Sequence, residues 1–174
     1  SLNVIKEFKS ISVDVIYALP FQTKQSLRET ITTLLSFDVV KHISAYELTL
    51  AEGTPLFKTR QDIPDEDEQE ELTDLCHSLL KDAGFARYEV SNFAKNGDVC
   101  KHNMRYWRRE PYLGLGPAAH SFDGAFRWSN PSSLKEYSAK LEEMTLPNSN
   151  PQKNSQQDSK EEFLFLSLRL VEGF

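Results

Sequence analysis

Cysteine is scarce in this sequence of 174 residues, which contains only Cys76 and Cys100. The two are not spaced as metal ligands usually are, and two thiols in an otherwise polar chain fit a reducing compartment, so we expect a cytoplasmic protein. The sequence also lacks an apolar run near the ~20 residues of a membrane-spanning helix, and we expect neither such a helix nor a signal peptide. A Gly-rich phosphate loop, a CxxC pair and a Ser-His-Asp order are absent as well, so no single short motif assigns a reaction.

Dense runs of positive charge are missing too. The net charge is −6 and no Lys/Arg stripe is present, which argues against a nucleic-acid partner. The nearest approach is a local basic patch of Lys101, Arg105, Arg108 and Arg109, whose charges can meet carboxylates or phosphates. Hydrophobic residues at 39% and aromatic residues at 11% are enough for a folded core. The length fits one domain, or one domain with part of another.

The first part of the sequence predicts a strand–helix–strand unit. Residues 11–19 form a β-branched run, which is typical of a buried strand. A helix follows to about residue 36, capped by Thr23 or Ser26, and residues 42–50 predict a second strand. Because the connection is a helix, we expect the two strands to be parallel neighbours with a right-handed crossover.

The rest of the sequence alternates periodic and polar stretches. We predict a helix over 65–82, with an acidic first turn and closed by Gly84, followed by a strand over 85–93 and a site loop over 94–130. A further helix is expected over 131–144, capped by Asn130 or Ser132. A polar linker with little to bury then covers 145–160, and an apolar helix covers 161–171. Two parallel strands alone make no stable sheet, and the last helix is apolar on too many sides for one partner. We therefore expect a segment from the middle of a longer protein.

Polar residues in two predicted strands are the first site candidates. Asp14 lies in a strand of Val and Ile, where a buried carboxylate needs a partner. Glu47 and Thr49 lie near the end of the next strand. In parallel α/β sheets ligands bind at the carboxyl ends of strands, so the three residues can face one crevice. The alternative is a structural hydrogen bond from Asp14 to a neighbouring strand or loop.

The segment 102–121 is richer in site-like residues, because it holds two histidines, His102 and His120, with Tyr106 and Trp107 near the first. Imidazole is the side chain best suited to ligate a transition metal near neutral pH. Two interpretations stay open for each group. The histidines are ligands or bond loop carbonyls, and the aromatic rings line a site or fill the core. The small residues before His120 make room for a flat ligand or form a tight turn.

Several sequence blocks, taken in order, resemble one family. The blocks are Ser12 to Thr23, His42 to Leu50 with Glu52 to Pro55, Tyr88 to Ala94, Cys100 to Trp107, and Tyr112 to Ser121. Together they resemble the radical S-adenosylmethionine proteins related to oxygen-independent coproporphyrinogen III oxidase. The His-Asn-x-x-Tyr-Trp block at 102–107 resembles the heme-chaperone branch of that family. The resemblance runs from about residue 10 to residue 174.

The resemblance implies an α/β fold, the carboxyl-terminal part of a partial (β/α)₆ barrel that holds a [4Fe-4S] cluster and S-adenosylmethionine, with an α+β extension and the start of a helical domain. The implied parts are residues 1–93 for the last strands and helices of the barrel, 94–144 for a loop-rich segment with a helix, 145–160 for the linker and 161–174 for the start of the helical domain. Ala18 departs from the glycine that is usual in the family, a mild change at a strand end.

Site residues follow from the same resemblance. Asp14 matches an acid that contacts S-adenosylmethionine, and Thr49 falls where another contact is made. His102 matches a histidine implicated in heme binding and would ligate the heme iron. Its motif is completed by Asn103, Tyr106 and Trp107.

The cluster-binding cysteines of the family, Cys-x₃-Cys-x₂-Cys, have no counterpart in this sequence, and neither Cys76 nor Cys100 can replace them. Without three thiolates there is no reductive cleavage of S-adenosylmethionine and no radical. We therefore expect this chain by itself to be catalytically inert, with the cluster ligands elsewhere in a longer parent.

Different functions stay open for the parent. One is a heme chaperone that delivers heme to an acceptor protein, with Arg105, Arg108 or Arg109 pairing with heme propionates. Another is oxidative decarboxylation of coproporphyrinogen III, and a third is that these residues are only scaffold. The His-Asn-x-x-Tyr-Trp block favours the chaperone.

Overall fold

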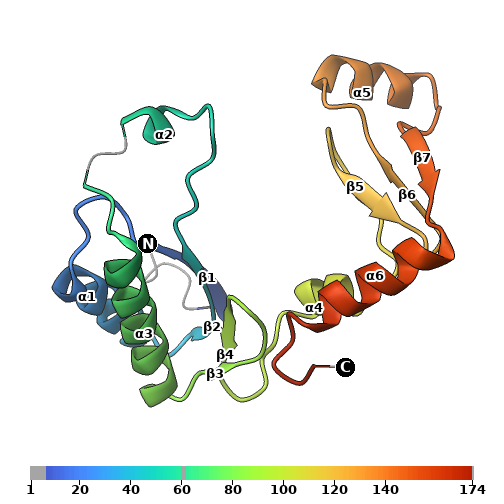
Figure 1. The fold of residues 1–174 in the computed structure, drawn as a ribbon. Helices are drawn as coiled ribbons and strands as arrows, with labels where there is room; N and C mark the ends of the chain where they lie inside the picture. Colours follow the sequence, from blue (N-terminus) through green and yellow to red (C-terminus); the bar gives the residue numbers. More distant parts are fainter. Residues whose placement is uncertain (1–6, 60–61, 174) are drawn as a thin grey trace. The chain divides into compact units, whose positions relative to one another are not determined.

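The computed structural model describes residues 7–59 and 62–173. The chain divides into two compact units, residues 1–99 and residues 100–174 (Figure 1). The first unit contains a four-stranded sheet and the second a three-stranded sheet. The division at residues 93, 144 and 160 that the family resemblance implies stays a prediction.

The first unit is built on the predicted strand–helix–strand motif. Its elements are β1 (Ile11–Tyr17), α1 (Lys24–Leu35), β2 (Val40–Glu47), α2 (Pro55–Thr59), α3 (Glu66–Asp82), β3 (Ala86–Arg87) and β4 (Asn92–Ala94). Strands β1 and β2 pair in parallel, which confirms that expectation, and the sheet order is β1-β2-β4-β3.

Short-range capping explains where the two long helices begin and end. Thr23 accepts a hydrogen bond from the Ser26 amide in a reciprocal capping box, and Asp65 forms the same arrangement with Glu68. Each box satisfies amides that would otherwise lack partners in the first helical turn. Gly84 follows α3 with a φ of +82°, a left-handed conformation that favours glycine. The predicted starts of both helices and the end of α3 are therefore confirmed.

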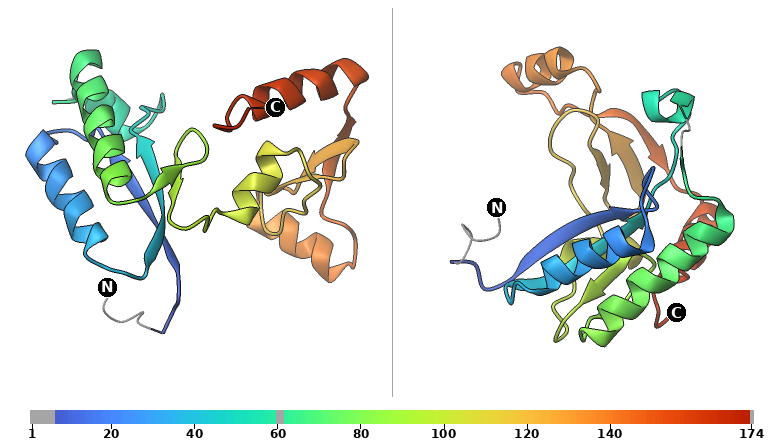
Figure 2. Two further views of the ribbon diagram at one scale, coloured as in Figure 1. Left: turned by 90° about the horizontal axis from the view of Figure 1, so that it is seen from below. Right: turned by 90° about the vertical axis from the view of Figure 1, so that its left-hand side faces the viewer.

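Helices α1 and α3 cover one face of this sheet (Figure 2). Their buried residues pack on the alternate sheet residues that point the same way, among them Val15, Tyr17, Ile43, Ala45 and Phe93. Side chains alternate between the two faces of a strand, so the other residues of β1 lie on the face without helices. For this reason the prediction of a buried strand was wrong for this face of β1, where Asp14 is exposed.

The predicted strand over 85–93 is two very short strands instead. Strands β3 and β4 pair with each other antiparallel, and β4 pairs antiparallel with β2. The turn between them is held by Glu89, which is 1% exposed and accepts a hydrogen bond from the Ser91 amide. A polar side chain that satisfies the backbone of a turn is not visible in hydrophobic periodicity.

Ala18 directly follows β1 and has a φ of +57°, in the left-handed region. Glycine adopts this conformation without a steric penalty, whereas alanine loses about 1–2 kcal/mol there. The replacement of the family's usual glycine by Ala18, which the family resemblance suggested to be mild, therefore lies at a backbone position that prefers glycine.

The second unit contains more regular structure than the sequence predicted. Its elements are α4 (Lys101–Trp107), β5 (His120–Phe122), β6 (Phe126–Ser129), α5 (Leu134–Glu142), β7 (Ser149–Lys153) and α6 (Gln156–Ser167). The three strands form an antiparallel sheet in the order β5-β6-β7.

The predicted loop over 94–130 and linker over 145–160 were wrong in this respect. Strand β7 and the start of α6 lie within the predicted linker. Strand β7 is stabilised by backbone hydrogen bonds to β6, and α6 begins at a Ser155–Asp158 capping box. Neither device needs apolar residues. Helix α5 is capped by Ser133, not by Asn130 or Ser132.

Candidate functional site

His102 lies on α4, the short helix that opens the second unit. Its side chain is exposed, and its Nε2 atom lies 3.0 Å from the hydroxyl of Tyr106, one helical turn further on. Residues four apart on a helix are neighbours on its surface, so the spacing in the sequence produces the contact directly. The two rings meet edge to face with centroids 4.9 Å apart. The imidazole is therefore both accessible and held in one orientation.

A chain of aromatic rings continues from this pair into the sheet. The rings of Tyr106 and Tyr112 are 4.6 Å apart in an edge-to-face arrangement, and Tyr112 is followed by Phe122 at 6.4 Å. Tyr112 and Phe122 also exchange two backbone hydrogen bonds of 2.8 and 2.9 Å. Edge-to-face pairs contribute beyond the area they bury. The position of Tyr106, and with it that of His102, is thus linked to strand β5.

Two arginines and one glutamate fix the far end of this chain of rings. The carboxylate of Glu162 on α6 accepts hydrogen bonds from Arg109 at 2.7 Å and from Arg127 at 2.9 and 3.0 Å. Both guanidinium groups also lie over the Phe122 ring, at 4.6 and 4.3 Å. The Arg127 hydrogen bonds, with a further contribution from Arg109, lower the pKa of Glu162 to about 2.

The ion pairs of Glu162 bear on the prediction that Arg105, Arg108 or Arg109 pairs with heme propionates. The Arg109 guanidinium is held by Glu162 and by the Ser159 hydroxyl, which makes Arg109 the least suited of the three arginines to pair with a propionate. Arg109 also has a φ of +56° directly after α4, where glycine is the usual residue. Arg105 and Arg108 are exposed and have only long ion pairs of 3.8 and 3.7 Å. They stay candidates by charge alone.

The remaining motif residues lie on the less exposed sides of α4. Asn103 and Trp107 are half-buried. The guanidinium of Arg169 lies over the Trp107 ring, 5.2 Å from its centroid, while the buried Nε1 atom of Trp107 has no hydrogen-bond partner among the residues that the structure describes. Sequence reasoning did not single out Arg169, which follows α6 by two residues, and no motif marked it.

The loop that precedes His120 is a tight turn. The Gly114 amide donates to the Ser121 hydroxyl at 2.9 Å, and its carbonyl accepts from the side-chain amide of Asn130 at 3.1 Å. A side chain at residue 114 would meet the backbone of His120. These small residues therefore form a tight turn, and a hollow of about 350 Å³, lined by Leu113, Gly114 and Leu115 among others, lies beside it.

In the first unit, the candidates taken from the sheet do not all share a face. Asp14 pairs in register with Ser44 on the face without helices, and Thr49 is exposed in the loop after β2. Glu47 instead contacts α3, with its carboxylate 3.2 Å from the Thr73 hydroxyl. The expected grouping of Glu47 with Asp14 was wrong, because the alternation of β2 turns residue 47 toward the helices.

A hydrogen-bonded group that sequence reasoning missed lies near Asp14. The two ring nitrogens of His42 are each 2.7 Å from a hydroxyl, Nδ1 from Ser12 and Nε2 from Tyr88. Burial lowers the pKa of His42 below its ordinary value, although the carboxylates of Asp14, Glu89 and Asp98 act in the opposite direction. A buried histidine with both nitrogens bonded is a structural element of the sheet.

The described residues do not fit an iron–sulfur cluster. Cys76 is a fully buried residue of α3, where burial raises the pKa of its thiol to about 11, and Cys100 lies just before α4. Within residues 7–59 and 62–173, no three His, Cys, Asp or Glu side chains are grouped so that they could hold a metal ion.

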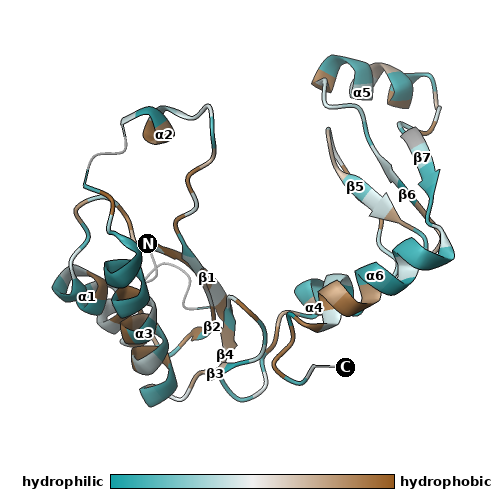
Figure 3. Cartoon of the chain, viewed as in Figure 1, coloured by the Kyte–Doolittle hydropathy of each residue, from teal (hydrophilic) through white to brown (hydrophobic). Residues whose placement is uncertain are grey.

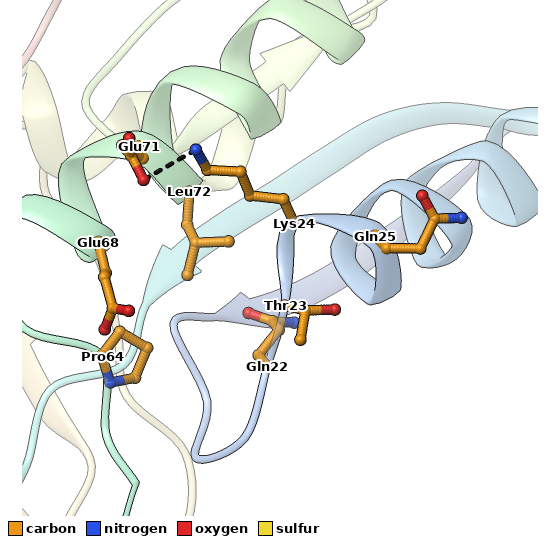
Figure 4. A pocket seen from close by; sticks show the side chains of 8 residues that line it. All are labelled: Gln22, Thr23, Lys24, Gln25, Pro64, Glu68, Glu71 and Leu72. Atoms are coloured by element: carbon orange, nitrogen blue, oxygen red, sulfur yellow. Dashed lines mark ion pairs between the residues drawn. The ribbon is translucent and has the colours of Figure 1, made fainter.

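A surface hollow of about 370 Å³ lies where the amino-terminal ends of α1 and α3 meet (Figure 4). An ion pair of 2.8 Å between Lys24 and Glu71 crosses it, and both side chains are 58% exposed. Exposed pairs of this kind contribute about 0–1 kcal/mol. The hollow therefore joins two helices and presents no group with unusual chemistry.

Comparison with known proteins shows which proteins this chain is similar to. No family model matches the chain. It is 34% identical over 170 residues to "Heme chaperone HemW" of Bacillus subtilis, which covers 95% of this chain and 45% of that protein. It is 34% identical to "Heme chaperone HemW" of Mycobacterium tuberculosis over 148 residues, covering 83% of this chain and 38% of the relative. It is also 42% identical over 114 residues to the mouse "Radical S-adenosyl methionine domain-containing protein 1, mitochondrial", covering 63% and 26%.

A solved structure adds evidence on the fold. Coproporphyrinogen III oxidase (HemN) from Escherichia coli, described as a radical SAM enzyme, matches 97% of this chain and 43% of its own with a TM-score of 0.77 and 21% identity. This match confirms the predicted fold class. The chain spans less than half the length of each of these relatives. Among its described residues, no helix is long and apolar enough to cross a membrane.

Proposed function

This chain is related to the radical S-adenosylmethionine proteins of the HemN and HemW group, and from that premise we propose that it forms the heme-binding part of a heme chaperone. The observation that carries the proposal is the exposed imidazole of His102, held by Tyr106 inside a motif that resembles one of the heme-chaperone branch. Curated relatives called heme chaperones, 34% identical, support it. The likeness to HemN supports the fold alone.

In this proposal His102 is the iron ligand. Histidine is the commonest protein ligand of heme iron, and a ligating imidazole is usually oriented by a hydrogen bond from its second nitrogen. Tyr106 makes such a contact with Nε2, so in this orientation Nδ1 is the nitrogen that would ligate the iron. Asn103 and Trp107 on the same helix complete the surface that meets the macrocycle. Heme would then pass to an acceptor protein.

The proposal also assigns the first unit. Asp14 and Thr49, both exposed, are proposed contacts of S-adenosylmethionine in the full-length protein. The ligands of its [4Fe-4S] cluster are proposed to lie outside this sequence, since the described residues offer no set of three thiolates. We propose that the protein lies in the cytoplasm, where cysteines outside disulfides, such as Cys76 and Cys100, persist.

One experiment separates this function from oxidative decarboxylation of coproporphyrinogen III. The full-length protein, with its cluster reconstituted, is incubated without oxygen with S-adenosylmethionine, a reductant and coproporphyrinogen III, and the porphyrins are separated by chromatography. A parallel sample is loaded with hemin and passed through gel filtration. We expect one heme to co-elute per chain and the coproporphyrinogen to be recovered unchanged.

Formation of protoporphyrinogen by this sample would overturn a purely chaperone function. Failure of heme to co-elute would remove the heme-binding proposal itself. A second sample that carries an alanine at each cluster cysteine of the full-length protein serves as the control, because it is expected to bind heme but has no radical chemistry.

A further inference from the structure

Another surface hollow, of about 520 Å³, lies beside β3, which stands last in the order of the four-stranded sheet. It is lined by residues of the last turns of α3, of the chain leading into β3, and of β3 and β4. The chain between α3 and β3 is largely hydrophobic (Figure 3). Two of the lining residues are the buried Phe85 and Phe93, and none of the described lining residues is acidic. The hollow therefore offers an apolar surface at the edge of a sheet.

Two positive charges lie at the same hollow. Lys81 and Arg87 line it and are exposed, and neither forms an ion pair with a carboxylate among the described residues. The Arg87 guanidinium is oriented by two backbone carbonyls of the turn after β3, to which it donates at 3.1 and 2.8 Å. Burial, and then the charge of Arg87, lowers the pKa of His77 in the lining, whereas Asp74 raises it. Carbonyls orient a cation without neutralising it, so Arg87 keeps its charge for an acidic partner.

The backbone of β3 also directs hydrogen-bonding groups outward from the sheet. In an antiparallel ladder, pairs of residues that exchange hydrogen bonds alternate with pairs that do not. The Tyr88 amide donates to the Asn92 carbonyl at 3.1 Å, and Arg87 stands next in the ladder, opposite Phe93. Arg87 therefore belongs to a pair without mutual hydrogen bonds, and its N–H and C=O point away from β4. An edge of this kind is a template for a further strand.

From this edge, the hollow and its two cations, we propose that β3 binds an extended acidic segment of a partner protein, which adds a strand to the sheet. In this mode of recognition, main-chain hydrogen bonds supply affinity and side-chain pockets supply specificity. Side chains on one face of a strand are two residues apart. The segment therefore places an acidic residue opposite Arg87, within reach of Lys81, and an apolar residue two positions away, over Phe85.

An extended peptide explains more of this surface than a small anion does. A small anion would use the charges of Lys81 and Arg87, but neither the apolar hollow nor the outward backbone groups of Arg87. The proposal concerns the first unit and does not depend on heme binding by the second.

The test measures binding of fluorescein-labelled peptides to the full-length protein by fluorescence anisotropy. The probe is Glu-Thr-Phe-Thr-Glu, in which an acidic residue lies two positions from the ring in either direction of the strand. The control peptide Gln-Thr-Phe-Thr-Gln is expected to bind about 5- to 10-fold more weakly, since it lacks the charges. A probe that is N-methylated at each residue has no backbone donors, and its affinity is expected to fall at least about 10-fold.

Variants of the protein locate the site. We expect Lys81→Gln to weaken binding of the acidic probe about 3-fold, and Arg87→Gln to weaken it about 10-fold, because Arg87 lies directly opposite the carboxylate. Lys9→Gln is the matched control, since Lys9 is exposed just before β1 at the opposite edge of the sheet, and it should leave the affinity unchanged. If Arg87→Gln does not fold, Lys81→Gln decides, because the Lys81 side chain has no hydrogen bond or ion pair among the described residues.

Equal affinity for the glutamate and glutamine peptides overturns the proposal, as does an affinity that is unchanged in Lys81→Gln or reduced equally in Lys9→Gln. Full affinity for the N-methylated probe overturns the pairing of strands. Displacement of the probe by free glutamate at the concentration of the peptide would instead indicate a site for a small anion. A dimer of the unliganded protein that Lys81→Gln abolishes would indicate a second copy of the chain as the occupant, and either result contradicts the proposal.

Discussion

Replacing Glu162 with glutamine is expected to destabilise the protein by about 2–3 kcal/mol. The carboxylate accepts hydrogen bonds from Arg109 and Arg127, whose side chains are 16% and 32% exposed, and its loss leaves two partly buried cations without a partner. An amide in its place has the right size but presents an NH₂ group to two donors. The free energy of unfolding, measured by urea denaturation, reports the change.

The neighbouring substitution Glu161→Gln is the control, because Glu161 is an exposed residue on the same helix, and it should change the free energy of unfolding by less than about 0.5 kcal/mol. Equal effects of the two substitutions would show that the network around Phe122 does not stabilise the second unit.

The same network predicts a pH dependence. The pKa of Glu162 is about 2 in the folded protein, against an ordinary value of 4.5. A lowered pKa means that the folded state favours the ionised form, so this contribution to stability is complete above about pH 5 and is lost as the pH falls toward 2. In Glu162→Gln the decline between pH 5 and pH 3 should be smaller than in the unchanged protein. An equal decline would contradict the assignment.

A comparably large effect is expected for Gly114→Ala. A Cβ atom at residue 114 would lie 2.9 Å from Cβ of Ala119 and closer still to the carbonyl oxygen of His120. Backbone cannot yield as a flexible side chain does, so the turn that carries Ser121 and Asn130 must shift. We expect a loss of about 3 kcal/mol or more in the free energy of unfolding, measured by urea denaturation.

The variant Gly116→Ala, two residues further along the loop, is the control that separates the steric effect of an added Cβ atom from the conformational effect of replacing glycine. Its φ is +103° and no atom lies within 4 Å of an added Cβ. Gly116→Ala should therefore lose only the conformational advantage of glycine, about 1–2 kcal/mol. If Gly114→Ala is no more destabilising than Gly116→Ala, the close approach of residues 114 and 120 is wrong.

The first unit was largely predictable because local rules set it. Capping residues such as Thr23 and Asp65 act within four positions of the helix they start, and Gly84 acts where its helix ends. Hydrophobic periodicity then selects the faces that pack. The exposed position of Asp14 was missed because periodicity tells which residues share a face of a strand, but not whether a second layer covers that face.

The second unit was harder for a different reason. Strand β7 is made of polar residues and depends on the backbone of β6, which no property of 149–153 reveals. Helix α4 is likewise supported by stacked rings and by ion pairs that join residues 109, 127 and 162, far apart in the sequence. Motif resemblance located His102 and Trp107, but Arg169 became visible only when the fold brought it over the Trp107 ring.

We propose that His102 ligates heme iron, and the most direct test of this role is a hemin titration followed by Soret absorbance. The full-length protein is compared with His102→Ala and with His120→Ala, which removes another exposed histidine of the second unit. We predict saturable binding of one heme per chain that is lost in His102→Ala and retained in His120→Ala. Binding that is absent from the unchanged protein, or that survives His102→Ala with the same affinity and spectrum, would contradict it.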